Sequence, residues 1–234
     1  MRSLGKVSII IPKRRGENIE RLLKSIRKSF YRDTEVIVVD EGKERAEQRN
    51  IGIKRAKGKY LLFADSDWEL HPRLIDECVA YMPCPVYIPE IIKTRGWFGR
   101  LRNWERQFYT NTAIDVVRFV RRKDCPLFDV EQKGTEDSDW DRRIKGIRVT
   151  ALYPYYHWDN VGVWQYFKKK AYYARSLNRF TERNPNDKIL NFKYRCWTVF
   201  TEKRKWRKLF HPYIFGLLFI LLVRGIIYLR GRTK

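Results

Sequence analysis

The sequence predicts an α/β protein with a mixed, mostly parallel sheet, helices that flank the sheet, and a further apolar helix at the C-terminus. Two observations predict the sheet. Short apolar runs alternate with segments of helical periodicity, and the runs are apolar throughout, as strands buried on both faces of a sheet must be. A third observation predicts the C-terminal helix, namely an almost unbroken apolar run over residues 213–229.

The first half of the chain carries the clearest alternation. The first strand is rich in β-branched residues and ends at Pro12, and the second helix ends at a glycine, which commonly terminates helices. Strands are expected at 6–12, 34–42 and 60–67, all three buried, and helices at 17–30 and 44–59.

The alternation continues less regularly through the second half. Aromatic and arginine residues interleave over 94–111, which suggests a membrane-facing helix or a lip of an acceptor site. A basic and aromatic segment, helical or irregular, fills 163–210. Between these landmarks we expect a helix at 71–82, a strand at 85–92, further strand pattern within 113–129, and an acid-rich helix followed by a short strand within 134–160.

The predicted division is a core over 1–160, interface helices over 161–211 and an anchoring helix over 212–234. At about 1.5 Å per residue the apolar run reaches roughly 25 Å, slightly less than a hydrocarbon core of about 30 Å. One spanning helix is expected, with Arg224 reaching back to the interface. An in-plane helix and a buried core helix are the alternatives.

The charge and the N-terminus indicate where the protein works. The net charge of +23 over 234 residues favours polyanionic partners, either nucleic acid, anionic lipid or phosphorylated small molecules. Five bases within 202–213 lie just before the apolar run, as is typical of the cytoplasmic membrane face. The first residues lack a secretory signal, and the four cysteines lack zinc-site spacing. We therefore expect the cytoplasmic face of the cell membrane.

Three aspartates follow predicted strands. Asp40 ends the second strand, and Asp65 and Asp67 end the third. Ligands of open parallel sheets bind beyond the carboxyl ends of the strands. A carboxylate pair there can hold Mn²⁺ or Mg²⁺, which shares its ligands with a diphosphate and stabilises the charge of a departing one. Alternatively, Asp65 caps the next turn and Asp67 is solvated.

Four blocks of sequence resemble family 2 glycosyltransferases of the GT-A fold. They are VSIIIP with GENIERLLKSI, EVIVVDEG, RNIGIKRAKGKYLLFADSD, and GTEDSDWDRRIKG, in the order of the family and over about residues 6–158. With the apolar C-terminus, the resemblance extends to dolichyl-phosphate mannosyltransferases, cellulose-synthase-like enzymes and archaeal mannosyltransferases of lipid-linked N-glycan assembly.

The resemblance implies roles for particular residues. Asp67 would ligate the metal, and Asp65 would approach the ribose or the metal. Asp137 would be the base, with Glu136 as its neighbour. The residues implied in binding the nucleotide sugar are Pro12, Lys13, Glu17, Asp40, Arg49, Asn50 and Asp65.

The assignment of Asp137 also has a chemical reason. Displacing a nucleoside diphosphate with inversion needs a base that takes the proton of the acceptor hydroxyl. The start of a helix suits an ionised carboxylate. The alternative is a capping turn at Thr135 whose acids form local pairs with Arg142 and Arg143.

Two later segments match the family pattern only in part. His157 lies where a third metal ligand or a phosphate contact would come from, although a histidine among aromatics is commonly structural. Gln165 matches the QxxRW box of cellulose-synthase-like enzymes, but Lys168 replaces its arginine and Lys169 its tryptophan. Gln165 and Lys168 are kept as candidate donor-site residues, since Lys168 would attract a diphosphate.

The expected function is an inverting, metal-dependent transfer of a sugar to a sugar of a lipid-linked, dolichyl-type glycan in N-glycan assembly. GDP-mannose is the expected donor by family analogy. One alternative is transfer to a polyprenyl phosphate, as in dolichyl-phosphate mannose synthases. An alternative of another class is a basic nucleic-acid or membrane binding protein. Acids at the strand ends would repel nucleic acid, so no nucleic-acid partner is expected.

Overall fold

The computed structural model describes residues 4–132, 134–159, 162–174 and 177–232. Its strands are β1 (Val7–Pro12), β2 (Thr34–Val39), β3 (Tyr60–Phe63), β4 (Trp68–Leu70), β5 (Val86–Tyr87), β6 (Glu90–Lys93), β7 (Val117–Arg121), β8 (Val149–Thr150) and β9 (Tyr155–Trp158). Its α-helices are α1 (Glu20–Arg27), α2 (Arg45–Arg55), α3 (Leu74–Ala80), α4 (Trp97–Arg106), α5 (Glu136–Arg143), α6 (Val163–Ala174), α7 (Leu177–Arg183), α8 (Val199–Thr201) and α9 (Ile214–Arg232). Short 3₁₀ or π segments are Arg122–Asp124, Lys188–Leu190, Tyr194–Thr198 and Glu202–Leu209.

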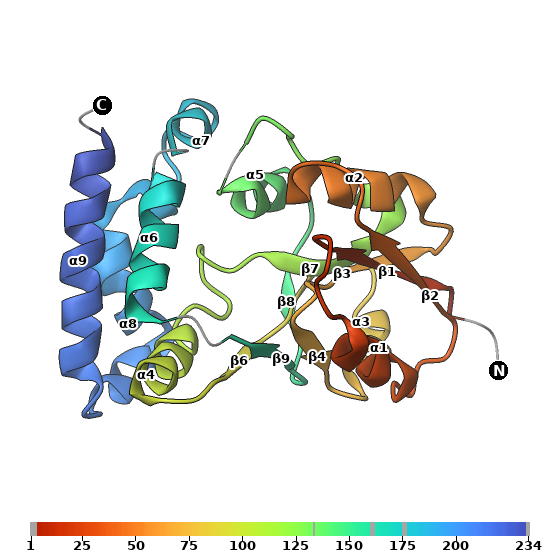
Figure 1. Ribbon diagram of the computed structural model, residues 1–234, viewed down its shortest axis with the longest axis horizontal. Helices are drawn as coiled ribbons and strands as arrows, with labels where there is room; N and C mark the ends of the chain where they lie inside the picture. Colours follow the sequence, from red (N-terminus) through yellow and green to blue (C-terminus); the bar gives the residue numbers. More distant parts are fainter. Residues whose placement is uncertain (1–3, 133, 160–161, 175–176, 233–234) are drawn as a thin grey trace.

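The strands form two sheets. The larger has the order β2-β1-β3-β7-β5-β8 and the smaller the order β4-β9-β6. In the larger sheet β1 runs parallel to β2 and β3, and β5 parallel to β8, whereas β7 is antiparallel to both of its neighbours. The predicted mixed, mostly parallel sheet with flanking helices is therefore confirmed (Figure 1).

Helices cover both faces of the larger sheet. Neighbouring residues of a strand point to opposite faces, so consecutive residues of β1 contact different helices. On one face, Ile9 of β1 packs with Leu22 of α1 and Leu74 of α3. On the other face, Ile10 packs in a cluster with residues of α2 and α5. Gly52 brings α2 close to β1, since a Cβ there would lie 2.3 Å from the Ile10 side chain. The contacts on this second face hold α2 and α5, the two helices that carry predicted site residues, against the sheet.

Two of the predicted strands differ from expectation. β2 is an edge strand rather than a buried one, and its Val36 and Val38 are 39% and 38% exposed. The expected strand at 85–92 is divided into β5 and β6, which belong to different sheets. The chain between β5 and β6 holds Pro89, which lacks the N–H that a central strand needs.

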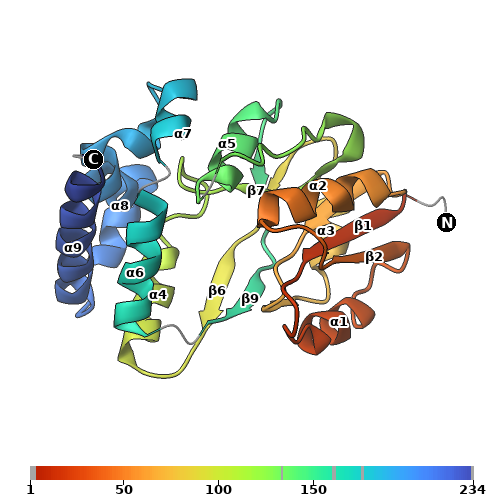
Figure 2. The same ribbon diagram turned by 45° about the horizontal axis from the view of Figure 1, so that its top comes forward.

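A group of helices lies at the end of the molecule away from β1 and β2 (Figures 1 and 2). The segment 94–111 contains α4, whose Phe98 and Trp104 are buried in a cluster with residues of α6, α8 and α9. Its aromatic residues therefore stabilise the interior, and Trp97 alone among its tryptophans is exposed.

The predicted C-terminal helix forms, but the prediction that it spans a membrane is not supported. Within the described residues, no helix combines the length and apolar character needed to cross a bilayer. One face of α9 is instead buried against α4 and α6 through Leu217 and Ile220. Arg224 does not reach for an interface, because it pairs with the fully buried Glu105 of α4 at 2.5 Å.

Candidate functional site

The carboxyl ends of β1, β2 and β3 meet at one edge of the larger sheet. Pro12 of β1 is level with Val39 of β2, and Ile10 is level with Phe63 of β3. Asp40 and Asp65 therefore leave the sheet at the same edge, two strand spacings or about 10 Å apart. Asp40 is exposed there. The pattern of strand ends thus brings the predicted acids to one side of the fold.

Arg49 of α2 joins two of these predicted residues from distant parts of the chain. Its side chain is 2% exposed, and its guanidinium lies between the carboxylates of Asp65 and Asp137, with 3.2 Å between Nη2 and Asp65 Oδ1. The other nitrogen, Nη1, pairs with Asp137 Oδ1. A buried arginine with two acidic partners is held rigidly, since leaving any of these charges unpaired would be costly.

Two more arginines complete this cluster, and sequence reasoning missed both. Arg45 pairs with Asp65 Oδ1 at 3.0 Å, and Arg118 of β7 pairs with Asp137 Oδ2 at 3.0 Å. Arg45 had a signal, because it lies four residues before Arg49 and so on the same helix face. Arg118 had none, because its position depends on β7 pairing with β3.

The arginines decide the ionisation of the two aspartates. Burial would raise the pKa of Asp65, but Arg45 and Arg49 outweigh burial and hold that pKa well below its ordinary value. Burial likewise opposes ionisation of Asp137, and Arg49 and Arg118 lower its pKa overall. Both groups are therefore carboxylates at neutral pH, balanced by guanidinium groups of the chain itself.

Asp67 belongs to a second set of contacts that extends into the smaller sheet. Pairing of β4 with β9 places Trp68 opposite His157, so that His157 Nε2 lies 3.0 Å from Asp67 Oδ2. The other ring nitrogen, Nδ1, lies 2.6 Å from Oε1 of Glu90, whose second oxygen pairs with Arg106.

His157 is a cation in this arrangement. Burial would lower its pKa, but the hydrogen bonds with Asp67 and Glu90 outweigh burial and raise the pKa to about 10. A protonated imidazole has no lone pair for a metal ion, so ligation by His157 would require it to lose a proton. Glu90 was not identified from the sequence, because only the β6–β9 pairing brings it to His157.

The fit of this region to a divalent metal rests mainly on Asp67. In the described part of the chain, no group of three or more histidine, cysteine, aspartate or glutamate side chains is placed to hold a metal ion. Asp67 Oδ1, however, is buried and has no hydrogen-bond partner. A carboxylate oxygen in that state suits a hard cation whose remaining ligands come from phosphate and water. The residues present therefore fit a metal held chiefly by Asp67.

Glu136 and Asp137 occupy the first turn of α5, as predicted. Burial, and then the negative charge of Asp137, raise the pKa of Glu136 to about 6. Its Oε2 atom is buried without a hydrogen-bond partner. Of the alternative interpretation, the cap at Thr135 is wrong, because its side chain makes no capping hydrogen bond, whereas local pairs do form between Asp139 and Arg143 and between Asp141 and Arg142. Two adjacent carboxylates thus have pKa values displaced in opposite directions, a pattern found where groups handle protons.

The other predicted donor-site residues divide into two groups. Glu17 lies at the site, since its Oε2 accepts hydrogen bonds from Arg14 N at 3.0 Å and from Ser66 Oγ at 2.8 Å. Asn50 holds the backbone of Phe128 through two hydrogen bonds, so its side chain supports the fold. The Lys13 carbonyl accepts a hydrogen bond from Gln48, which ties its loop to α2.

Gln165 and Lys168 are not brought to the carboxylates. Both are exposed on α6, and Gln165 accepts a hydrogen bond from the nearby Gly162 N at 3.3 Å. Tyr173, further along α6, is the residue of this helix that senses the charge of the site. Burial and the charge of Glu136 raise its pKa to about 12. The face of α6 that approaches the site was not distinguishable from the sequence.

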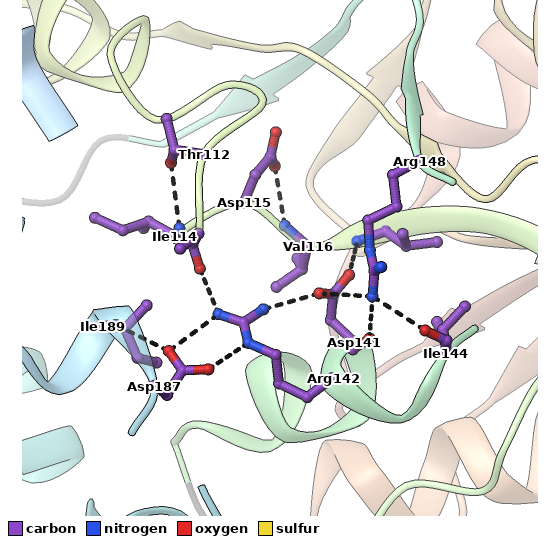
Figure 3. Close-up of polar contacts among 12 residues, drawn as sticks. Thr112, Ile114, Asp115, Val116, Asp141, Arg142, Ile144, Arg148, Asp187 and Ile189 are labelled. Atoms are coloured by element: carbon purple, nitrogen blue, oxygen red, sulfur yellow. Dashed lines mark hydrogen bonds and ion pairs between the residues drawn. The ribbon is translucent and has the colours of Figure 1, made fainter. Parts of the chain in front are cut away.

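Arg142 anchors the end of α5 that lies away from Glu136 and Asp137 (Figure 3). Its guanidinium donates to Asp187 at 2.6 Å, to Asp141 at 2.8 Å and to the Ala113 carbonyl at 2.6 Å. Asp141, 1% exposed, accepts a further hydrogen bond from Val117 N at the start of β7. This network connects α5 to the sheet and to the chain that follows α7.

Replacing Arg142 with methionine is expected to lower the free energy of unfolding by about 2–4 kcal/mol. The largely buried Asp187 loses the arginine that pairs with it, and the buried Asp141 loses Arg142 and keeps Arg148. Urea denaturation measures this change. Arg122→Met is the matched control, since Arg122 is exposed. An unchanged denaturation midpoint in Arg142→Met would show that the network does not stabilise the fold.

Comparisons with known proteins add a family and a fold. The family model described as glycosyl transferase family 2 matches residues 43–200, which is more than half of the chain. No curated protein matches the chain significantly in sequence.

Solved structures resemble the chain in fold. TarS of S. aureus is 20% identical with a TM-score of 0.50, over 94% of this chain and 49% of the TarS chain, so this chain spans about half of its length. TarS 1–349 in complex with UDP-GlcNAc is 20% identical with a TM-score of 0.50, over 94% and 81% of the two chains. Mannosyltransferase PcManGT from Pyrobaculum calidifontis, in complex with GDP-Man and Mn²⁺, is 14% identical with a TM-score of 0.61, over 96% and 87%.

Proposed function

The chain belongs to glycosyl transferase family 2, and we propose that it transfers a sugar, with inversion, from a nucleoside diphosphate sugar to a hydroxyl of a lipid-linked glycan. The observation that carries this proposal is the bridge made by Arg49 between Asp65 and Asp137. It brings a donor-side acid, Asp65, and a candidate base, Asp137, together through a residue from a third part of the chain. An inverting transfer needs this arrangement, because the base and the leaving group lie on opposite sides of the anomeric carbon.

The donor nucleotide is proposed to bind at the carboxyl edge of β1, β2 and β3. Asp40 is exposed at this edge, Pro12 is the last residue of β1, and Lys13 and Glu17 lie in the loop that follows it. Asp65, kept ionised by Arg45 and Arg49, would accept hydrogen bonds from the ribose. The placement follows the general rule for ligands of open parallel sheets.

A divalent cation, Mn²⁺ or Mg²⁺, is proposed at Asp67, with Asp65 nearby. When bound, the ion would stabilise the negative charge that develops on the departing diphosphate. The free Oδ1 of Asp67 supports this placement. His157 holds the other oxygen of Asp67 and so fixes the direction of the carboxylate.

Asp137 is proposed as the base that accepts the proton of the attacking hydroxyl. Arg49 and Arg118 keep it ionised, but they also reduce its affinity for a proton. The neighbouring Glu136 acts in the opposite sense, because its negative charge raises the proton affinity of Asp137. We propose that Glu136 in this way sets the basicity of Asp137.

This role of Glu136 predicts a pH dependence. Glu136 is protonated below about pH 6 and charged above it, so kcat/KM is expected to fall as the pH decreases through about 6. Glu136→Gln should lower kcat about tenfold and abolish this limb of the profile. Glu131→Gln, an exposed change in the preceding loop, is the control. If Glu136→Gln were inactive while Asp137→Asn remained active, the two roles would be reversed.

GDP-mannose is the proposed donor, by analogy with mannosyltransferases of the family. PcManGT was solved with GDP-Man, whereas TarS was solved with UDP-GlcNAc, so the base and the sugar both require a test. Thermal shifts with GDP, UDP and their sugars, each with and without Mn²⁺, provide it. A ligand of the folded state raises the apparent melting temperature. A larger shift with GDP-mannose is expected, and a larger shift with UDP sugars would replace this donor.

The acceptor and the cellular location are proposed together. We propose that the protein works at the cytoplasmic face of the cell membrane in N-glycan assembly, with α9 lying on the bilayer. The outer face of α9 carries exposed apolar side chains, with Phe215 77% and Leu222 64% exposed. Arg207 and Lys208 are exposed just before it, whereas Lys205 is turned inward to the carbonyls of residues 108 and 110.

This location predicts binding to vesicles that contain anionic phosphatidylglycerol, weakening as salt increases. Phe215→Ser with Leu222→Ser should reduce cosedimentation at least tenfold, because two apolar side chains no longer enter the bilayer. Phe30→Ser, an exposed change on the distant side of the fold, is the control. Equal cosedimentation of both variants would contradict binding through α9.

Mild-acid lability of the product would reveal transfer to a polyprenyl phosphate instead of to a sugar.

A further inference from the structure

A cavity lies beside the proposed active site. This cavity of about 240 Å³ is lined by residues of α4, α6, α7, α9, the start of α5 and the chain between α7 and α8. None of the predicted site residues lines it. Five basic side chains do, namely Arg102, Arg106, Lys170, Arg195 and Arg224.

The charges of these five residues are not balanced. Arg102 and Arg224 share the carboxylate of Glu105, and Arg106 pairs with Glu90. Across the residues that the structure describes, neither Lys170 nor Arg195 has an acidic partner. The Lys170 ammonium lies over the rings of Tyr166 and Tyr173, with 5.5 and 5.9 Å to their centroids.

An unpaired cation that is removed from water and surrounded by other basic side chains is costly unless an anion binds beside it. Burial, with the nearby charges of Arg102 and Arg195, lowers the pKa of Lys170 to about 7. Arg195 makes one long hydrogen bond, 3.5 Å to the carbonyl of Ile189. An anion with oxygens for both groups would relieve this cost, and phosphate offers the strongest acceptors for it.

One part of the lining is apolar and reaches the outer surface at Phe192. Leu177, Ile189, Leu221 and Ile227 line the cavity together with Phe192, which is 59% exposed. Gly225 of α9 also lines the cavity and lies beside Phe192 in space, since a Cβ at Gly225 would lie 3.7 Å from the Phe192 ring. A free phosphate ion gains nothing from such walls, whereas an alkyl chain does.

The cavity also adjoins the proposed base. Thr135 and Ser138, which precede and follow Glu136 and Asp137 in the sequence, both line it. Tyr173 of α6 lines it as well. A molecule held in the cavity would therefore present its head to the first turn of α5.

We propose that this cavity binds the phosphate or diphosphate group of a long-chain lipid alcohol, held by Lys170 and Arg195, with the chain leaving past Phe192 and Gly225. The assignment of this lipid as the acceptor rests on the proposed function. The binding itself does not, because it follows from the cavity alone.

The test measures binding of farnesyl phosphate by calorimetry, below the concentration at which it forms micelles. The wild-type protein is expected to bind it at least tenfold more tightly than inorganic phosphate, pyrophosphate or farnesol. Lys170→Met and Arg195→Met should each weaken binding at least tenfold. Lys193→Met, an exposed change two residues from Arg195, should leave it unchanged.

Neither Lys170 nor Arg195 has a carboxylate to leave unpaired, so both methionine variants should keep the wild-type melting temperature. If one variant fails to fold, the other tests the same claim. The proposal would be overturned if both variants bound farnesyl phosphate as tightly as the wild type does. It would also be overturned if the wild type bound inorganic phosphate as tightly as farnesyl phosphate. Binding of farnesyl phosphate without turnover of any nucleotide sugar would leave the cavity assigned and would refute the proposed function.

Discussion

Asp137→Asn is expected to lower kcat about a thousandfold, the middle of the range for loss of a general base. Asparagine keeps the shape of the side chain but cannot take the proton of the acceptor hydroxyl. Affinity for the donor should change far less, because Arg45 and Asp65 remain paired. Steady-state release of the nucleoside diphosphate measures both quantities.

The change also leaves Arg49 and Arg118 with one fewer carboxylate, so some loss of stability is expected. Circular dichroism and the melting temperature separate this effect from loss of the base. Asp76→Asn, an exposed change on α3, is the matched control for activity. A folded Asp137→Asn variant that retained more than a tenth of the wild-type kcat would rule out Asp137 as the base.

Asp67→Asn is expected to lower kcat at least a hundredfold at a fixed concentration of Mn²⁺. The amide can still accept a hydrogen bond from His157, but it lacks the negative charge that a hard cation requires. Activity should therefore depend more weakly on the metal, with half-maximal activation at a higher Mn²⁺ concentration. A titration of activity against Mn²⁺ measures this shift.

Asp76→Asn again serves as the control, since it removes an exposed carboxylate of α3 that is not among the site residues. The wild-type enzyme should lose its activity with a chelator and regain it with Mn²⁺ or Mg²⁺. If Asp67→Asn showed the wild-type dependence on metal, the proposed position of the cation would be wrong.

The sheet and the edge that carries the acids were predictable from local pattern. The alternation of apolar strands and helices gave β1, β2 and β3 in order, and parallel strands place their carboxyl ends together. The acids of α5 were likewise visible in the sequence. What the pattern could not give was the second positive charge beside Asp137, because Arg118 reaches the site through an antiparallel strand pair.

The C-terminal helix shows a second limit of the sequence. Its composition is apolar on every side, which is typical both of a membrane span and of a helix that packs against others. The contact that distinguishes them is the pairing of Arg224 with Glu105 of α4. Glu105 lies 119 residues earlier in the chain, so this pairing was not visible in the sequence. Likewise, Lys168 and Lys170 look equivalent in sequence, and only the packing of α6 on α9 distinguishes the exposed residue from the one that lines the cavity.

The most direct test of the central claim is the turnover of a panel of nucleotide sugars with a lipid-linked glycan acceptor and Mn²⁺. The proposed site predicts that the wild-type protein releases a nucleoside diphosphate from at least one of them and inverts the anomeric configuration in the product. It also predicts that chelator and Asp137→Asn both abolish this release. Release that persists in Asp137→Asn, or a product of retained configuration, would contradict the account.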